Sequence, residues 1–438
     1  MKIAQLTPGS GDNFYCENCL RDAALVRALR DIGHDVLMIP MYLPLQSDKD
    51  QKLSNAPIFF GGINVYLQQK LSFFRKTPRW IDRMFDSEKL LDWVGRKADM
   101  TSAKDLGLTT ISMLRGEHGK QIKELHRLID WLNCPQNKPD VVCLSNILLA
   151  GLVRQIKTAL GVPVICLLQD EDGFLDGLTS PYSEQAWQII TERSREIDAF
   201  ISVSEYFAEV MKNRLNLDSE KIHVVYTGIP TDKYEPADVK PDIPVIGFLS
   251  RMCSNKGLDS LVEAFIILKD NDTLKKAKLR IAGGKNPSDN DFIEMLKTKL
   301  DSVDMLGDVE FTGDFDQDSR HDFLRSLTVL SVPEKTPVAY GLYVLEALAA
   351  GVPVIEPDFG VFRELIRETG GGALYEPGNV NALAQALEKV LLDANYAHQL
   401  GTAGREAIVN KFDIAKTAAE MTRIYEHVTK NVSEDNNA

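Results

Sequence analysis

Residues 330–357 (LSVPEKTPVAYGLYVLEALAAGVPVIEP) constrain the fold of this chain more than any other stretch. The apolar run Leu327–Pro333 predicts a buried strand, and a polar loop that contains Gly341 follows it. The next apolar positions are spaced as in a short helix, which we expect to end before a second apolar strand, Val352–Ile355. This order of strand, glycine loop, helix and strand predicts a helix start whose backbone N–H groups can bind a phosphate.

One acidic residue, Glu346, lies about one turn inside the expected helix. Its carboxylate could accept hydrogen bonds from sugar hydroxyls while the helix start holds a phosphate. An ordinary surface glutamate on a βα unit fits the spacing equally well. The two interpretations therefore have to be decided by the rest of the chain.

The length and composition describe an ordinary soluble globular protein. A chain of 438 residues exceeds one hydrophobic core, so we expect two domains of roughly 200 residues each. The net charge of −13 argues against nonspecific nucleic-acid binding, which needs a basic face. We expect no signal peptide in the first residues, and no apolar run reaches the ~18 residues of a membrane span. We expect a cytoplasmic protein, and contact with a membrane surface and the oligomeric state stay open.

The six cysteines are spread over the chain, which suits free thiols in a reducing compartment. Cys16 and Cys19 form a CxxC pair. No second ligand pair accompanies it, so we expect no metal site. Structural thiols are the main interpretation, and a redox pair is the alternative.

The first half of the chain predicts a doubly wound domain over residues 1–236. Gly9 and Gly11 lie in the first strand–helix loop without a third glycine at the dinucleotide spacing. The aromatic and basic segment Phe73–Trp93 is interpreted as helices packed on the sheet, with an acceptor-binding lobe as the alternative. Glu117 and His118 are interpreted as the solvated face of a helix, with a catalytic role for either residue as the alternative.

An acidic loop, Gln169-Asp170-Glu171-Asp172-Gly173, follows the apolar run Val162–Leu168. Ligands bind at the carboxyl ends of strands in open α/β sheets. Three crowded acids raise one another's pKa, which suits acid–base work or hydroxyl binding. A solvated helix-capping turn is the alternative.

The βα pattern restarts after a linker rich in Pro and Asp and predicts a second doubly wound domain over residues 237–410. A last helix within residues 411–438 is expected to pack back on the first domain. Arg251 and Lys256 follow the first strand of the second domain, where two cations suit a diphosphate and could stabilise it as a leaving group. Solvated surface cations are the alternative. Gly283 and Gly284 end the next strand and permit close approach of a ligand.

Five motifs in the second half carry a resemblance to a known family. They are Arg251 with Lys256-Gly257, Ala282-Gly283-Gly284, Phe311-Thr312-Gly313, the run Gly341–Val354, and Pro377-Gly378. Their order and spacing resemble the C-terminal domain of retaining GT-B glycosyltransferases of group 1 (family 4, glycogen synthase-like). The N-terminal half is similar more loosely, through its glycine loop, Gly33–Val36, Val203-Ser204, and Gly61–Leu67, which is similar to glycogen and starch synthases.

The resemblance implies the GT-B fold, two Rossmann-like doubly wound domains facing across a cleft. It also implies a nucleotide diphosphate-sugar donor, a carbohydrate, lipid-linked or small-molecule acceptor, and no cofactor or metal. Arg251 and Lys256 match the family's diphosphate pair, Glu346 matches the second glutamate of the E-x7-E motif, on the donor ribose, and Gly341 and Leu342 match the loop that meets the phosphates.

On the donor side the resemblance adds Gly11, in the loop facing the donor phosphates, and Gly284. Two positions depart from the family. Val338 stands where the first glutamate of E-x7-E contacts the donor sugar, with Glu334 nearby. In the family a histidine is frequent after the strand expected at Val141–Leu144, where this chain has Ser145-Asn146, and at another position, where this chain has Gln169-Asp170. Asp170 is then the candidate catalytic replacement, together with Glu171.

We therefore predict a hexosyltransferase that retains the anomeric configuration. Val338 motivates an alternative, a catalytically impaired sugar-nucleotide-binding protein. A related GT-B epimerase is a third interpretation. A redox protein using Cys16 and Cys19 is a fourth.

Overall fold

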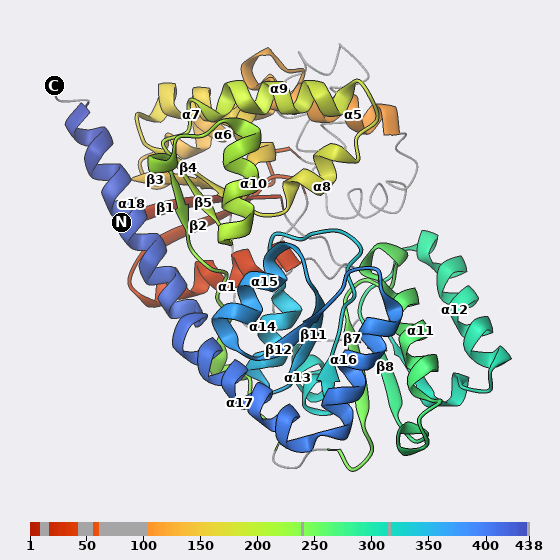
Figure 1. Ribbon diagram of the computed structural model, residues 1–438. Helices are drawn as coiled ribbons and strands as arrows, with labels where there is room; N and C mark the ends of the chain where they lie inside the picture. The colour runs from red at the N-terminus through yellow and green to blue at the C-terminus, as the bar shows by residue number, and fades with distance from the viewer. Residues whose placement is uncertain (9–16, 43–55, 61–102, 238–240, 314–316, 436–438) are drawn as a thin grey trace. The chain divides into compact units, whose positions relative to one another are not determined.

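A computed structural model describes residues 1–8, 17–42, 56–60, 103–237, 241–313 and 317–435. The chain divides into two compact units (Figure 1). Unit 1 comprises Met1–Tyr226 with Ala418–Ala438, and unit 2 comprises Thr227–Thr417. Among the described residues, each unit is built on a six-stranded parallel sheet with helices, so the predicted pair of Rossmann-like doubly wound sheets is confirmed. The cleft expected between them stays a prediction.

Unit 1 alternates strands and helices along the chain. Its elements are β1 (Lys2–Thr7), α1 (Glu17–Asp31), β2 (Asp35–Pro40), α5 (Ala103–Leu114), η3 (Gly116–His118), α6 (Ile122–Leu132), β3 (Val141–Leu144), η4 (Ile147–Leu152), α7 (Val153–Leu160), β4 (Val164–Leu168), α8 (Glu171–Asp176), α9 (Tyr182–Ser194), β5 (Ala199–Ser202), α10 (Glu205–Leu215), η5 (Ser219–Lys221) and β6 (Ile222–Val224). A last helix, α18 (Ile414–Asp435), joins this unit from Ala418 onward.

The sheet of unit 1 has the order β2-β1-β3-β4-β5-β6, with every pair of strands parallel. The chain reverses its direction of travel between β1 and β3, which makes that pair the switch point of the sheet. β3 and β4 are buried along their whole length and consist of apolar residues, as strands covered on both faces require. Figure 1 shows α7 and α9 on one side of these strands and α1 on the other.

α18 packs on the face of this sheet that carries Cys143. The Tyr425 ring is fully buried, and its hydroxyl lies 3.4 Å from the Cys143 Sγ. In the part of α18 that belongs to unit 1, the Thr422 hydroxyl lies 3.0 Å from Nε2 of His34. The last helix is therefore part of the unit 1 core.

Unit 2 repeats the same alternation. Its elements are η6 (Thr231–Lys233), β7 (Val245–Leu249), η7 (Ser254–Lys256), α11 (Leu258–Leu268), η8 (Asp272–Leu274), β8 (Lys278–Ala282), η9 (Pro287–Asp289), α12 (Asn290–Ser302), η10 (Leu306–Asp308), β9 (Val309–Thr312), α13 (Gln317–Arg325), β10 (Val329–Leu330), α14 (Leu342–Ala349), β11 (Val354–Pro357), α15 (Gly360–Thr369), β12 (Gly372–Tyr375), α16 (Val380–Leu392) and α17 (Ala394–Lys411).

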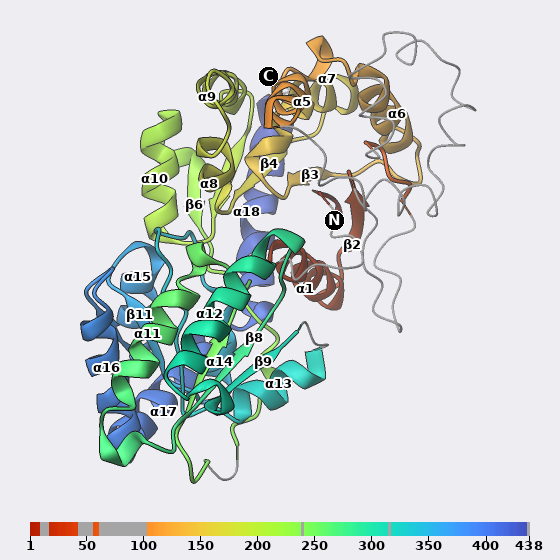
Figure 2. The same ribbon diagram turned by 90° about the vertical axis from the view of Figure 1, so that its right-hand side faces the viewer.

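The sheet of unit 2 has the order β12-β11-β10-β7-β8-β9 and is parallel throughout. The strand order reverses between β7 and β10. In Figure 1, α14 and α17 lie on one side of the strands and α11 and α16 on the other. Figure 2 shows β8 and β9 running between α12 and α13. Both faces are covered, as in the doubly wound folds.

One strand boundary differs from the prediction. The second strand of the βα unit was expected at Val352–Ile355, but β11 covers Val354–Pro357. The Val352 N–H donates to the Ala347 carbonyl at 2.9 Å and so closes the end of α14 instead of joining the sheet. β11 therefore ends two residues later, and Glu356 lies inside it.

None of the helices in the described ranges is long and apolar enough to cross a membrane.

Candidate functional site

The expected donor-side residues gather at the switch point of the unit 2 sheet. β7 and β10 are neighbours there, and the loops that follow them leave the sheet in the same direction. The β7 loop carries Arg251 and Lys256, and the β10 loop carries Glu334. Open α/β sheets bind ligands at this position, outside the carboxyl ends of the strands.

Arg251 is partly exposed and is paired with a carboxylate. Its Nε and Nη2 each donate to one carboxylate oxygen of Asp289 at 2.9 Å, which is the two-point geometry that arginine also forms with phosphate. The hydrogen bonds that Arg251 donates to Asp289 raise the pKa of Arg251. Burial acts to raise the pKa of Asp289, but the bonds from Arg251 and from the Asn286 N–H outweigh it and hold that pKa below its ordinary value. A bound anion would therefore compete with Asp289 for Arg251.

Lys256 is held in the same way by the other loop. Its Nζ lies 2.6 Å from Oε1 of Glu334, with the lysine side chain 28% exposed and the glutamate side chain 2% exposed. Gly257 follows with φ +70°, and a Cβ there would lie 1.7 Å from the Pro333 carbonyl oxygen. Only glycine fits this contact, so the close approach of the β7 and β10 loops depends on Gly257.

Glu356 lies beside this pair and was missed by the sequence reasoning. It is fully buried in β11, where Oε1 accepts the Val332 N–H at 3.3 Å and Oε2 has no partner among the described residues. Burial, with the nearby charge of Glu334 as a smaller cause, raises the pKa of Glu356 well above its ordinary value. The available signal was one acid inside the apolar run VPVIEP.

Glu346 is buried rather than an ordinary surface glutamate. Its Oε1 accepts the Tyr234 hydroxyl at 2.8 Å and Nη1 of Arg320 at 3.0 Å. Its Oε2 is also buried and has no partner among the described residues. Tyr234 and Arg320 lie 112 and 26 residues away in the sequence, and the sequence reasoning did not find either.

The start of α14 provides backbone rather than side-chain donors. Gly341 is its N-cap and makes no side-chain capping bond, and Leu342 is its first residue. Gly283 has φ +134°, and a Cβ there would lie 2.1 Å from the Ser250 carbonyl oxygen. The adjacent Gly284 carbonyl accepts the Met252 N–H at 2.9 Å, so the loops after β7 and β8 also touch.

Val338 takes an apolar position. Its side chain is buried, and its carbonyl accepts the Val361 N–H at 3.3 Å. Gly360 has φ +54°, and a Cβ there would lie 3.1 Å from the Val338 nitrogen. Position 338, where the first E-x7-E glutamate was expected, is thus part of the core. The carboxylate in the loop after β10 is that of Glu334.

In unit 1, Asp170 and Glu171 of the acidic loop after β4 lie in different environments. Asp170 is exposed, with φ +71°, and precedes α8 without a side-chain cap. Glu171 is buried, and its two oxygens accept the N–H groups of Ile147 at 3.1 Å and Gln169 at 2.6 Å. Glu171 therefore ties the β3 loop to the β4 loop.

The crowding of acids does not explain the pKa of Glu171. Burial raises that pKa to about 7, and the backbone N–H groups reduce the effect. The expectation that three neighbouring acids raise one another's pKa was wrong for Glu171, because desolvation is the main cause and neither Asp170 nor Asp172 is among the causes. Gly11 and the rest of the Gly9–Asp12 loop lie outside the described residues.

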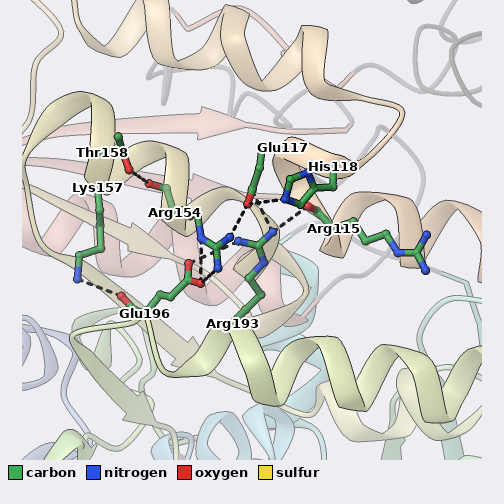
Figure 3. Close-up of polar contacts among 8 residues, drawn as sticks. All are labelled: Arg115, Glu117, His118, Arg154, Lys157, Thr158, Arg193 and Glu196. Atoms are coloured by element: carbon green, nitrogen blue, oxygen red, sulfur yellow. Dashed lines mark hydrogen bonds and ion pairs between the residues drawn. The ribbon is translucent and has the colours of Figure 1, made fainter.

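Glu117 belongs to an ion-pair network, shown in Figure 3. Its side chain is 10% exposed and accepts Nη1 of Arg154 and Nη2 of Arg193, both at 2.9 Å, while both arginines also bond Glu196. Burial acts to raise the pKa of Glu117, and its hydrogen bonds with its own backbone and Arg193 lower it overall. The interpretation as a solvated face was wrong for Glu117 and fits only His118, which is 75% exposed. The network joins η3, α7 and α9.

Among the described residues, no group of three or more His, Cys, Asp or Glu side chains could hold a metal ion. Burial raises the pKa of the Cys143 thiol to about 12, which makes it unreactive. Cys16 lies outside the described residues, as do Gly61–Leu67 and Phe73–Trp93, so the redox pair and the aromatic segment stay predictions.

Two family descriptions match adjacent parts of the chain. Residues 232–407 match Glycosyl transferases group 1, and residues 111–233 match Glycosyltransferase Family 4. Together they cover most of the described residues of both units. The first match contains every donor-side residue described above except Gly11.

Curated relatives are also glycosyltransferases. An uncharacterized glycosyltransferase of Methanocaldococcus jannaschii is 25% identical over 238 residues, 51% of this chain and 59% of the relative. A D-inositol 3-phosphate glycosyltransferase of Streptomyces bingchenggensis is 25% identical over 240 residues, 52% of each chain. A GDP-mannose-dependent alpha-(1-6)-phosphatidylinositol monomannoside mannosyltransferase of Mycobacterium tuberculosis is 28% identical over 210 residues, 44% of this chain and 53% of the relative. The matches thus span about half the length of these relatives.

Solved structures share the fold over the whole chain. Sucrose-phosphate synthase from Thermosynechococcus elongatus has a TM-score of 0.69 at 16% identity and covers 98% of this chain and 99% of its own. Anabaena HepE in complex with UDP has a TM-score of 0.67 at 15% identity and covers 98% and 100%. At these identities the likeness shows the fold.

Proposed function

Because this chain belongs to the group 1 family of GT-B glycosyltransferases, we propose that it transfers a sugar from a nucleotide diphosphate-sugar to an acceptor hydroxyl with retention of configuration. The observation that carries the proposal is the pairing of Arg251 and Lys256 at the switch point of the unit 2 sheet. Both cations lie in one loop, at the edge where α/β sheets bind ligands.

In this proposal the donor diphosphate binds Arg251 and Lys256 in place of the carboxylates of Asp289 and Glu334. Arg251 presents two N–H groups to Asp289, and Lys256 presents one ammonium to Glu334. Phosphate oxygens satisfy the same donors, and the uncapped start of α14 at Gly341 and Leu342 adds backbone N–H groups. Gly284 keeps the neighbouring loop free of a side chain. Gly11, which lies outside the described residues, is included as a donor-side residue only because its loop resembles that of the family. No metal or cofactor is part of the proposal.

Glu346 binds the nucleoside. Its Oε2 is the carboxylate atom without a partner among the described residues, while Oε1 is fixed by Tyr234 and Arg320. A ribose diol donates hydrogen bonds to such an oxygen. Tyr234 and Arg320 orient the carboxylate, so they are positioning residues.

The reaction follows from these contacts. The acceptor hydroxyl attacks the anomeric carbon on the face from which the diphosphate departs, and the bond to the diphosphate oxygen breaks. Arg251 and Lys256 stabilise the negative charge that develops on the leaving group. Asp170, exposed at the carboxyl end of β4, is the polar group proposed to act on the acceptor side.

The acceptor class is proposed from the relatives. Two of them carry inositol phosphate or a phosphatidylinositol glycoside in their names. We therefore place phosphorylated or lipid-linked polyols first, ahead of glucans, and we place GDP-mannose and UDP-sugars first among the donors.

A screen of nucleotide-sugar donors against these acceptors tests the proposal, with release of nucleoside diphosphate and the anomeric configuration of the product as readouts. We expect product with the donor's own configuration. Val338 supports a second candidate, a binding protein without turnover, because its buried side chain supplies no carboxylate. Calorimetric binding of a donor with no transfer would favour that candidate, and release of an epimerised free sugar would favour an epimerase.

A further inference from the structure

Glu171 joins the two loops that follow β3 and β4 in unit 1. Its Oε1 accepts the Ile147 N–H at 3.1 Å, at the start of η4, and its Oε2 accepts the Gln169 N–H at 2.6 Å. The Gln169 side chain adds a third bond between the loops, because its Nε2 donates to the Ser145 carbonyl. Glu171 is 4% exposed. Two loops that are far apart in the sequence therefore share one buried carboxylate.

Asp170 lies between the residues that make this junction. Gln169 precedes it and Glu171 follows it, so the backbone on both sides of Asp170 is held by buried hydrogen bonds. Asp170 itself is exposed and has φ +71°, in the left-handed region, which is unfavourable for a residue with a Cβ. Such a conformation persists where the surrounding structure fixes it. The buried neighbours of Asp170 therefore place its exposed side chain.

The far end of α8 is fixed as well. Asp176, its last residue, accepts Nη1 and Nη2 of Arg214 at 2.8 and 2.7 Å and the indole N–H of Trp187 at 2.8 Å. Arg214 lies in α10 and Trp187 in α9, and Cζ of Arg214 lies 4.1 Å from the centroid of the Trp187 ring. Movement of α8 is therefore opposed at both of its ends.

We propose that Glu171 is a positioning residue for Asp170 in the transfer reaction. Its carboxylate holds the loops after β3 and β4 together and so fixes where Asp170 presents its own carboxylate to the acceptor hydroxyl. Glu171 does not touch the acceptor, because it is buried and both of its oxygens accept backbone N–H groups. This role rests on the proposed function of Asp170.

Replacing Glu171 by glutamine breaks the junction with little change of shape. A glutamine side chain has one oxygen that accepts and one NH2 group that only donates, so one of the two backbone N–H groups loses its acceptor. A misplacement of about 1 Å costs about a hundredfold in rate where a group has to meet a reacting atom. We expect kcat to fall by about tenfold or more in Glu171→Gln. The donor KM should stay unchanged, because the cations proposed to bind the donor lie in unit 2.

A double-mutant cycle separates this role from general damage to the fold. Asp170→Asn removes the charge and keeps the left-handed backbone, which asparagine tolerates, and it should lower kcat by about a hundredfold. If Glu171 acts through Asp170, the double variant should be no slower than Asp170→Asn alone. The assays are run at about pH 8, above the pKa of about 7 of Glu171, so that the wild-type carboxylate is ionised.

Asp198→Asn is the matched control. Asp198 also joins two elements of this sheet, because its Oδ2 accepts the Val164 N–H at 2.8 Å while its Oδ1 accepts Nζ of Lys157 at 2.7 Å. It lies at the amino end of β4, opposite the end that carries Asp170, so its loss should leave kcat unchanged. A fall in kcat equal to that of Glu171→Gln would show that loosening any such junction slows transfer, and it would overturn the inference.

Two further results would also overturn it. One is wild-type kcat in Glu171→Gln, and the other is a double variant whose kcat falls by the product of the two single effects. Full turnover by Asp170→Asn would remove the acceptor-side role of Asp170, and with it the role of Glu171. Failure of the wild type to transfer from any donor would instead contradict the proposed function. If Glu171→Gln does not fold, Glu171→Asp, whose side chain is too short to reach both N–H groups, takes its place in the cycle.

Discussion

At the level of single residues, the candidate site consists of charged pairs whose members lie far apart in the sequence. Arg251 and Lys256 follow an apolar strand, and that pattern is visible in the sequence. Asp289 and Glu334 lie 38 and 78 residues further along, and only the parallel order of the strands brings them to the β7 loop. A local sequence pattern cannot predict such ion pairs between distant residues.

Replacing Glu346 should destabilise unit 2 strongly. Glu346→Ala removes the carboxylate that pairs with the buried Arg320 at 3.0 Å, and breaking a buried pair from one side costs about 3 kcal/mol or more. Urea unfolding followed by fluorescence measures the loss. Glu310→Ala is the matched control, because its pair with Arg280 is largely exposed and should change stability by under ~1 kcal/mol. Equal effects of the two substitutions would contradict the assignment.

The pKa of Glu171 gives a pH-dependent prediction. Its folded pKa, about 7, lies above the ordinary 4.5, so the folded state binds the extra proton between these values and loses stability as pH rises through them. The shift corresponds to about 3 kcal/mol. The free energy of unfolding of Glu171→Gln, minus that of the wild type, should therefore rise from about pH 5 to about pH 8. Urea unfolding at several pH values measures it, and a difference that stays constant would rule out the buried acid.

For helices and strands, the sequence predicted which elements exist better than it predicted the residues at which they begin and end. The apolar runs of β3 and β4 and the helix at α14 were visible, because covered parallel strands are continuously apolar. The limits of β11 were not visible, since the Val352 N–H bonds to α14 instead of to the sheet. Local apolar pattern does not reveal such a competition between partners.

The contact between the β7 and β10 loops depends on one glycine. Gly257→Ala would set its Cβ 1.7 Å from the Pro333 carbonyl at φ +70°, so the loops must separate and Lys256 must shift from Glu334. We expect a lower thermal midpoint and at least tenfold weaker nucleotide binding. Gly378→Ala is the control: its φ is +76° with nothing near the new Cβ, so it should cost only about 1 kcal/mol of strain and keep binding. Unchanged binding in Gly257→Ala would contradict this role.

At the scale of the whole molecule, repetition made the architecture predictable. Two successive βα series predicted two doubly wound sheets, and the structure has two six-stranded parallel sheets with a switch point in each. The cations of the candidate site were predictable, because they lie in the loop after β7, at the switch point of the unit 2 sheet. Its buried acids were not, because Glu356 lies in an apolar strand and Glu334 lies four residues from the position where a family glutamate was expected.

Turnover by Lys256→Ala is the sharpest test of whether Lys256 stabilises the diphosphate leaving group. With the donor that the wild type uses, release of nucleoside diphosphate should fall by at least a hundredfold, roughly the effect of removing one donor that stabilises a developing charge. Lys299→Ala removes a cation of α12 that pairs with Glu263 on the exposed surface, and it should leave turnover unchanged. Wild-type turnover in Lys256→Ala would show that Lys256 does not stabilise the leaving group.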